Sequence, residues 1–141
     1  MRKILFVCHG NICRSPMAEY LLKYYLNEYN INDIYVESRA TSREEIGNKV
    51  HYGTRKILDK YNIDYSNKRA TQITYDDVIN YDDIYCMDQN NINNLKRMFG
   101  DNPKFKLLLE KGIADPWYTG DFNKTHEDIL LGINNILKYY R

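Results

Sequence analysis

The sequence predicts an α/β fold with a parallel sheet, because short apolar segments alternate along the chain with segments of helical periodicity. The clearest strand is Ile4–Cys8, a continuous apolar run typical of a central strand that is buried on both faces. Further strands are expected at residues 34–36, 83–87 and 105–109. Ligands of such sheets bind beyond the carboxyl ends of the strands, so a functional site is expected there.

The first two helices follow from apolar spacing and from their start signals. Ser15 is expected to cap the helix after the first strand, and Pro16 suits its first turn. A second helix is expected near residues 49–61. The apolar residues that support the two helices are Met17, Leu21, Leu22, Tyr25 and Leu26 in the first, and Val50, Ile57, Leu58 and Tyr61 in the second.

The second half of the chain contains two further helices and a loop. Asp88 is expected to cap the helix that follows the third strand. Residues 115–118 are expected to form a loop, because the residue before a proline is driven out of helical geometry. Thr125–Asp128 matches a capping box, which predicts that the final helix begins there.

Composition places the chain among compact proteins, and residues 1–141 are expected to form a single domain. Hydrophobic residues make up 43% and charged residues 28%, which excludes a disordered tail, and a net charge of +1 argues against a surface built for nucleic acid. The N-terminal apolar run ends after five residues, so neither a signal peptide nor membrane insertion is expected. The three cysteines match no disulfide framework or metal site, which favours a reducing cytoplasm and no metal or other cofactor.

The loop between the first strand and the first helix has the features of an oxyanion site. Backbone N–H groups that turn inward there, together with the positive end of the helix, can hold a tetrahedral anion. Gly10 permits a backbone conformation closed to other residues, and Asn11 tolerates left-handed geometry. The loop lacks the Gly-Lys-Ser/Thr ending of a nucleotide-binding loop.

Cys8 and Arg14 give this loop a chemistry beyond binding. The dipoles that attract phosphate also favour a thiolate at Cys8, and Ser15 could donate a hydrogen bond to the same sulfur. Arg14 supplies a planar fork for two phosphate oxygens. The Cys-x5-Arg spacing is weakly specific alone, and the alternative is a buried structural cysteine beside a surface arginine. The buried strand that precedes the loop and the Ser-Pro helix start that follows it favour the catalytic interpretation.

At these residues the chain resembles the low-molecular-weight protein-tyrosine phosphatase family. The segment from Val7 to Glu19 is similar to the family signature almost residue for residue, and Asp115-Pro116 resembles its second motif. The resemblance runs through Ser38 and residues 86–88 to the final helix. It implies a four-stranded parallel sheet flanked by helices on both faces, with the phosphate loop after the first strand, and cysteine-dependent hydrolysis of aryl phosphates without a metal.

The resemblance also implies roles for individual residues. Cys8 would be the nucleophile, Arg14 the transition-state clamp and Asp115 the general acid, with Asn11 and Ser38 as a hydrogen-bond pair that holds the loop open. The residues expected to bind phosphate are His9, Gly10, Asn11, Ile12, Cys13, Arg14 and Ser15.

The three cysteines differ in what is expected of them. The resemblance implies that Cys13 can form a reversible disulfide with Cys8, which would protect the nucleophile, and the alternative of a small packed residue stays open. Cys86 lies within a strand and is interpreted as core.

An acid near the leaving group is required because a phenolate departs faster when it is protonated. Asp115 is the candidate, since Pro116 stiffens its loop, although an ordinary Asp-Pro turn is the alternative. Trp117 and Tyr118 follow and could form walls around an aromatic substrate ring.

Other functions are weighed against this prediction. A protein-arginine phosphatase would share the loop, but in the family it tends to carry threonine where Ile12 stands. An arsenate reductase would need a cysteine relay, and Cys86 has no neighbouring cysteine. A non-catalytic oxyanion-binding module would need neither nucleophile nor acid. The expected partners are phosphotyrosine proteins, with a tyrosine kinase as one candidate, and no nucleic acid.

Overall fold

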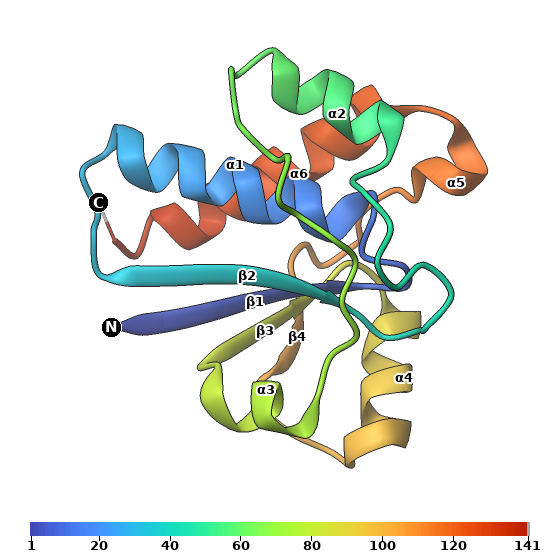
Figure 1. Ribbon diagram of the computed structural model, residues 1–141. Coiled ribbons are helices and arrows are strands. Elements are labelled where there is room, and N and C mark those ends of the chain that lie inside the picture. The colour runs from blue at the N-terminus through green and yellow to red at the C-terminus, as the bar shows by residue number, and fades with distance from the viewer. Residues whose placement is uncertain (141) are drawn as a thin grey trace.

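The computed structural model describes residues 1–140, which form a four-stranded parallel sheet between two layers of helices (Figure 1). The strand order is β2-β1-β3-β4, with β1 at Arg2–Cys8, β2 at Ile34–Ala40, β3 at Asp83–Cys86 and β4 at Phe105–Leu107. All three neighbouring pairs are parallel. The predicted fold class is confirmed.

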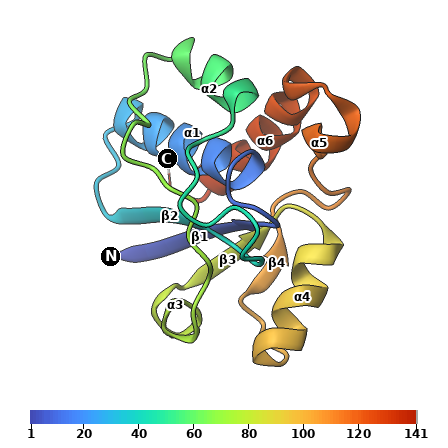
Figure 2. The ribbon, with the colours of Figure 1, turned by 45° about the vertical axis from the view of Figure 1, so that its right-hand side comes forward.

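The helices divide between the two faces of the sheet (Figure 2). On one face lie α1 (Arg14–Glu28) and α6 (Phe122–Leu137), with α2 (Tyr52–Asp59) beside them, and the other face carries α3 (Tyr75–Asn80) and α4 (Gln89–Phe99). The single-turn helix α5 (Pro116–Thr119) immediately precedes α6. Among residues 1–140, no helix has the length and apolar character needed to cross a membrane.

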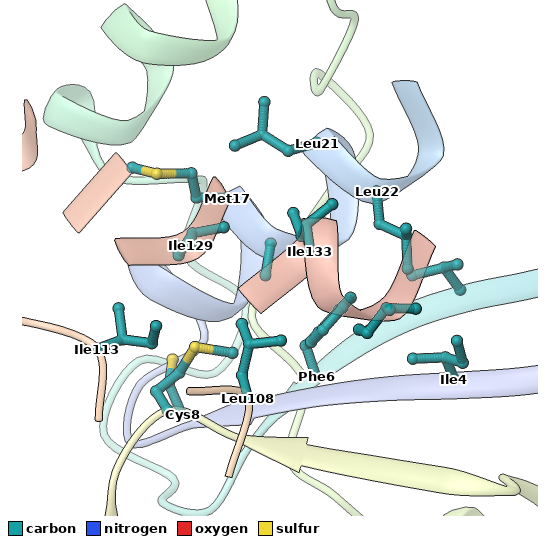
Figure 3. Packing of buried hydrophobic residues seen from close by; sticks show 14 of the residues in the cluster. Ile4, Phe6, Cys8, Met17, Leu21, Leu22, Leu108, Ile113, Ile129 and Ile133 are labelled. Carbon is teal, nitrogen blue, oxygen red and sulfur yellow. The ribbon is translucent and has the colours of Figure 1, made fainter. Parts of the chain in front are cut away.

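The central strand β1 is buried on both sides, as its continuous apolar run predicts. Ile4, Phe6 and Cys8 pack into one hydrophobic cluster with α1 and α6, whereas Leu5 and Val7 belong to the cluster under α3 and α4. Figure 3 shows the first cluster, in which Cys8 lies at the edge of the apolar layer, close to Ile113. The nucleophile candidate therefore ends a strand that is buried on both faces.

Two predicted helix starts are wrong. Helix α1 begins at Arg14 with Cys13 at the N-cap and no side-chain cap, so Ser15 lies inside the first turn. Helix α6 begins at Phe122, where Asp121 accepts a hydrogen bond from the N–H of Lys124. Thr125 is buried and its hydroxyl donates to the carbonyl of Ala114. In both cases tertiary hydrogen bonds use the side chains that the local pattern assigns to capping.

Other boundaries differ by a few residues. The second helix covers 52–59 rather than 49–61, β2 continues four residues beyond Val36, and the short helix α3 was not predicted. Residues 116–119 form a helical turn instead of a loop, because Asp115 itself remains extended and caps that turn. The cap predicted at Asp88 is confirmed, with its carboxylate accepting from the N–H of Asn91.

Candidate active site

The loop from Cys8 to Arg14 lies at the floor of a cleft of about 580 Å³, at the carboxyl end of the central strand. Asn11 has a φ of 59°, the left-handed conformation expected of it, and this conformation turns its backbone N–H toward the Cys8 sulfur at 3.2 Å. The cleft is lined by Cys8, His9, Gly10, Ile12, Cys13, Arg14, Glu44, Glu45, Asp88, Asn90, Asn91, Asn94, Asp115, Trp117 and Tyr118.

A chain of buried hydrogen bonds holds the sulfur from behind. The Ser15 hydroxyl lies 3.0 Å from Cys8 Sγ, and Asn11 Nδ2 donates to Ser15 Oγ at 2.7 Å and to Ser38 Oγ at 2.9 Å. The amide orientation of Asn11 is fixed because its Oδ1 accepts from the N–H of Thr71. The residues predicted to support the loop, Asn11, Ser15 and Ser38, are thus brought into one network.

Arg14 is the cation of the cleft and its guanidinium is held rigidly. Its Nη1 donates to Asp88 Oδ2 at 2.9 Å and to the carbonyl of Ile113 at 3.1 Å, and its Nη2 lies 3.4 Å from Asp115 Oδ2. Burial lowers the pKa of Arg14, but the negative charges of Cys8, Asp115 and Asp88 outweigh burial and raise it overall. Arg14 therefore stays charged beside the sulfur, ready to face a phosphate.

Asp115 lies at the cleft wall, about a hundred residues from the loop in sequence. Its Oδ1 accepts from the N–H of Trp117 at 3.0 Å, its Oδ2 faces Arg14, and 28% of its side chain is exposed. Trp117 and Tyr118 follow on α5 and are 72% and 85% exposed. Large aromatic side chains left exposed at a cleft can pack against an aromatic ligand.

The sequence model of the low-molecular-weight phosphotyrosine protein phosphatase family matches residues 3–139. This chain belongs to that family. The low-molecular-weight protein-tyrosine-phosphatase PtpA of Staphylococcus epidermidis is 40% identical, over 99% of this chain and 94% of the relative.

Solved structures of the same family match closely. SP-PTP, a low-molecular-weight protein tyrosine phosphatase from Streptococcus pyogenes, superposes with a TM-score of 0.90 at 42% identity, covering 100% of this chain and 94% of the other. YfkJ from Bacillus subtilis superposes with a TM-score of 0.93 at 34% identity, covering 99% and 94%.

The two other cysteines have different surroundings within this phosphatase fold. Burial, and then the charge of Cys8, raises the pKa of Cys13 to about 12. Burial likewise raises the pKa of Cys86, which is fully enclosed in the cluster under α4. All three cysteines are free. The interpretation of Cys86 as a core residue is confirmed.

His9 lies at the cleft rim, where its Nε2 is 2.9 Å from Glu44 Oε2. Its carbonyl accepts from the N–H and the hydroxyl of Ser42, so residue 9 also joins the phosphate loop to the segment after β2. Whether its backbone N–H contributes to phosphate binding stays a prediction, as it does for the remaining residues of the loop.

Sequence reasoning missed three residues that hold this site. Asp88 orients Arg14 as well as capping α4, and its position directly after a strand could have indicated the first role. Glu19 and Lys68 end the hydrogen-bond chain behind the loop. The four-residue spacing of Ser15 and Glu19 along α1 was a signal, since side chains at that spacing share one helix face. Lys68 gave none.

Metal binding has no support in the part of the chain that the structure describes. No group of three or more His, Cys, Asp or Glu side chains within residues 1–140 is arranged to hold an ion. The charge of a bound phosphate would instead face Arg14 and backbone N–H groups.

Proposed function

We propose that this protein hydrolyses phosphotyrosine in proteins through a covalent phosphocysteine on Cys8. One observation carries the proposal: Cys8 Sγ accepts from the Asn11 N–H and lies 3.0 Å from the Ser15 hydroxyl, which can donate to it, in a cleft that also holds Arg14 and Asp115. Two hydrogen-bond donors on one sulfur stabilise an anion, and a thiolate is the reactive form of cysteine.

The first step transfers the phosphoryl group to sulfur. The Cys8 thiolate attacks phosphorus, the bond between phosphorus and the tyrosine oxygen breaks, and Asp115 gives its proton to that oxygen. Asp115 is partly exposed and lines the same cleft as Cys8, which suits this transfer. Arg14 and the loop N–H groups hold the charge on the equatorial oxygens.

The second step restores the enzyme. A water molecule gives a proton to the Asp115 carboxylate and attacks phosphorus, and the phosphorus–sulfur bond breaks to release phosphate and the Cys8 thiolate. Asp115 is then protonated again, as the first step requires. Trp117 and Tyr118 are proposed to contact the tyrosine ring, and their exposure supports that role.

The proposal also covers the redox role of Cys13, the choice of substrate and the cellular compartment. Cys13 lies in the same loop as Cys8 and both cysteines are free, which supports the redox role predicted for it. A peroxide would oxidise Cys8 to the sulfenic acid, and the Cys13 sulfur, after losing its proton, would attack that sulfur to form the disulfide, with the displaced hydroxide and the proton leaving as water. Ile12 lines the cleft, and because protein-arginine phosphatases of the family tend to carry threonine there, it supports phosphotyrosine over phosphoarginine. Action in the cytoplasm and on a tyrosine kinase stay predictions.

The test compares Cys8→Ser and Asp115→Asn with wild type. Cys8→Ser should abolish turnover of p-nitrophenyl phosphate and of phosphotyrosine peptides, because the hydroxyl is not ionised at neutral pH. Asp115→Asn keeps the cap on α5 but has no proton to give, so it should slow phosphotyrosine turnover by about 10²–10⁴ and slow p-nitrophenyl phosphate, with its better leaving group, much less.

Asp121→Asn is the matched control, because Asp121 caps α6 as Asp115 caps α5 but is not among the residues that line the cleft. It should behave as wild type. Equal losses for both leaving groups would reject Asp115 as the acid, and turnover that survives in Cys8→Ser would reject the mechanism. Faster turnover of phosphoserine or phosphoarginine peptides than of phosphotyrosine peptides would reject the substrate.

A further inference from the structure

The segment that carries Asp115 is held to the first turns of α6 through a single residue, Ala114. The hydroxyl of Thr125 donates to the Ala114 carbonyl at 2.8 Å, and the Ala114 N–H donates to Asp128 Oδ2 at 3.0 Å. The same hydroxyl lies 3.4 Å from the Asp121 carbonyl, so its bond to Ala114 is the stronger one. Thr125 and Asp128 are both buried and lie three residues apart on one face of α6.

Asp128 is a buried carboxylate that two lysines approach from the solvent side. Its Oδ1 lies 3.0 Å from Lys111 Nζ and 3.1 Å from Lys124 Nζ, and both lysine side chains are partly exposed. Burial raises the pKa of Asp128, but the Ala114 N–H and the two ammonium groups outweigh burial and lower it overall. The Ala114 N–H therefore donates to a charged acceptor, which makes a stronger hydrogen bond than a neutral one.

The contacts of Asp115 itself lie mostly within the turn that follows it. Its Oδ1 accepts from the N–H of Trp117, and its carbonyl accepts from the N–H of Tyr118. Trp117 and Tyr118 are largely exposed, and the contact between Asp115 Oδ2 and Arg14 Nη2 is long at 3.4 Å. The place of Asp115 over the cleft therefore depends on how the chain enters this turn, at Ala114.

On its other side, Ala114 follows a residue that is fixed at the phosphate-binding part of the cleft. The Ile113 carbonyl accepts from Arg14 Nη1 at 3.1 Å, and Figure 3 shows Ile113 close to Cys8. Ala114 thus connects a fixed point beside the nucleophile to the acid. A shift of Ala114 would move Asp115 relative to the phosphorus that Cys8 attacks.

We propose that Thr125 and Asp128 are positioning residues, which hold Ala114 so that the Asp115 carboxyl stays within reach of the leaving oxygen. The inference rests on the proposed function, since it concerns the acid of the same reaction. Neither side chain is among the residues that line the cleft, so both act through Ala114. Because proton transfer requires hydrogen-bond distance, a small shift of Asp115 should slow most the leaving groups that need protonation.

The experiment replaces Thr125 by valine, which keeps the branched shape but cannot donate to the Ala114 carbonyl. It measures kcat/KM, which reflects the steps up to release of the phenol, for a phosphotyrosine peptide and for p-nitrophenyl phosphate. Thr125→Val should lose about tenfold with the peptide and less than about twofold with p-nitrophenyl phosphate, the better leaving group. Thr125→Ser, which restores the donor, should recover most of the loss.

Thr54→Val is the matched comparison, because Thr54 is also fully buried and donates to a backbone carbonyl, that of Cys13 in the phosphate loop, at 3.0 Å. That bond supports the part of the cleft that holds the phosphate, so its loss should slow both substrates by the same factor. Thr125→Val losses that are equal for the two substrates, as expected of Thr54→Val, would overturn the proposal.

A double variant tests whether Thr125 acts through the acid. Asp115→Asn has no proton to place, so adding Thr125→Val to it should slow the peptide by less than about twofold more. A further loss of about tenfold would overturn the proposal, because Thr125 would then act on another part of the reaction.

Trp117, the single tryptophan of the chain, reports on the same turn without turnover. It lies two residues beyond Asp115, so a loosened Ala114 should lower its fluorescence anisotropy in Thr125→Val but not in Thr125→Ser. A Thr125→Val protein with the anisotropy of wild type would overturn the proposal.

Asp128→Asn serves where Thr125→Val does not fold, because its amide keeps an oxygen for the Ala114 N–H but loses the charge. It should show the same pattern with a smaller loss, about threefold with the peptide. A wild-type ratio between the two substrates would overturn the proposal. A wild type that cleaves neither substrate would overturn the proposed function and this inference together, whereas an active wild type whose variants lose both substrates equally would overturn the inference alone.

Discussion

Single carboxylates in this protein serve two elements at once, and Asp88 is the clearest case. Its Oδ1 accepts from the N–H of Asn91 and caps α4, while its Oδ2 accepts from Arg14 Nη1 at 2.9 Å. Asp88, which follows β3, therefore orients Arg14, which ends the loop after β1. Stability and catalysis at this position can be separated by the choice of substitution.

Asp88→Asn keeps an oxygen for the cap but loses the charge that holds Arg14. We expect kcat/KM for p-nitrophenyl phosphate to fall about tenfold with little loss of stability, because a charge-assisted hydrogen bond is replaced by a weaker one. Asp88→Ala should lose the cap as well and unfold about 1 kcal/mol more easily. Urea unfolding and steady-state kinetics measure the two effects, and an Asp88→Asn protein with wild-type kinetics would show that Asp88 is only a cap.

At the scale of elements, the long helix α6 closes the face of the sheet that carries α1. Its apolar side packs into the main cluster through Ile129, Ile133, Ile136 and Leu137. Gly132 lies in the same buried stripe, where a helix-favouring alanine would otherwise be preferred. The reason is close approach: a Cβ built there would lie 2.5 Å from Leu108 Cγ and 3.0 Å from the Leu108 carbonyl oxygen.

Gly132→Ala should therefore destabilise the protein, although alanine has the higher helix propensity. Leu108 is buried and its backbone cannot move freely, so overpacking is expected to cost about 1–3 kcal/mol. Urea unfolding measures the loss. The control is Asn135→Ala, on the exposed side of the same helix, which should leave stability unchanged or slightly higher. A Gly132→Ala protein as stable as this control would show that α6 can shift away from Leu108.

At the scale of the whole molecule, Asp83 joins three strands of the sheet at the edge opposite the cleft. This buried carboxylate on β3 forms ion pairs with Arg2 of β1, whose Nε lies 2.9 Å from Oδ2, and with Lys106 of β4, whose Nζ lies 2.7 Å from Oδ1. Burial raises the pKa of Asp83, but the hydrogen bonds and charges of Arg2 and Lys106 outweigh burial and lower it overall. The folded pKa is thus below the ordinary value of about 3.9.

A carboxyl whose pKa is lowered by folding stabilises the protein above its unfolded pKa, and that contribution disappears as the pH falls through the folded pKa. Asp83→Asn should therefore be less stable than wild type at pH 7, and its stability should fall less steeply between about pH 5 and pH 2. Asp101→Asn is the control, because the Asp101 side chain is 89% exposed, and it should keep the wild-type slope. Parallel slopes for Asp83→Asn and wild type would contradict the assignment.

The catalytic loop was the part most open to prediction, because strand, cradle and helix start are contiguous from Ile4 to Pro16. Capping was predicted less well. Asp88 caps a helix as its sequence pattern predicted. Ser15 and Thr125 instead form hydrogen bonds with Cys8 and Ala114, which capping patterns do not predict. The short helix α3 carries too few apolar residues for its periodicity to be seen.

The sequence alone determined the parallel α/β class, the four strands with the helices α1, α2, α4 and α6, and the central place of β1, because each depends on residues close together along the chain. Only the tertiary structure decided that Asp88 orients Arg14, that Asp115 faces the cleft and that Lys68 meets Glu19 behind the loop. These contacts join residues 49 or more positions apart, and which of them form is set by how the helices pack on the sheet, which the spacing of residues along the chain does not encode.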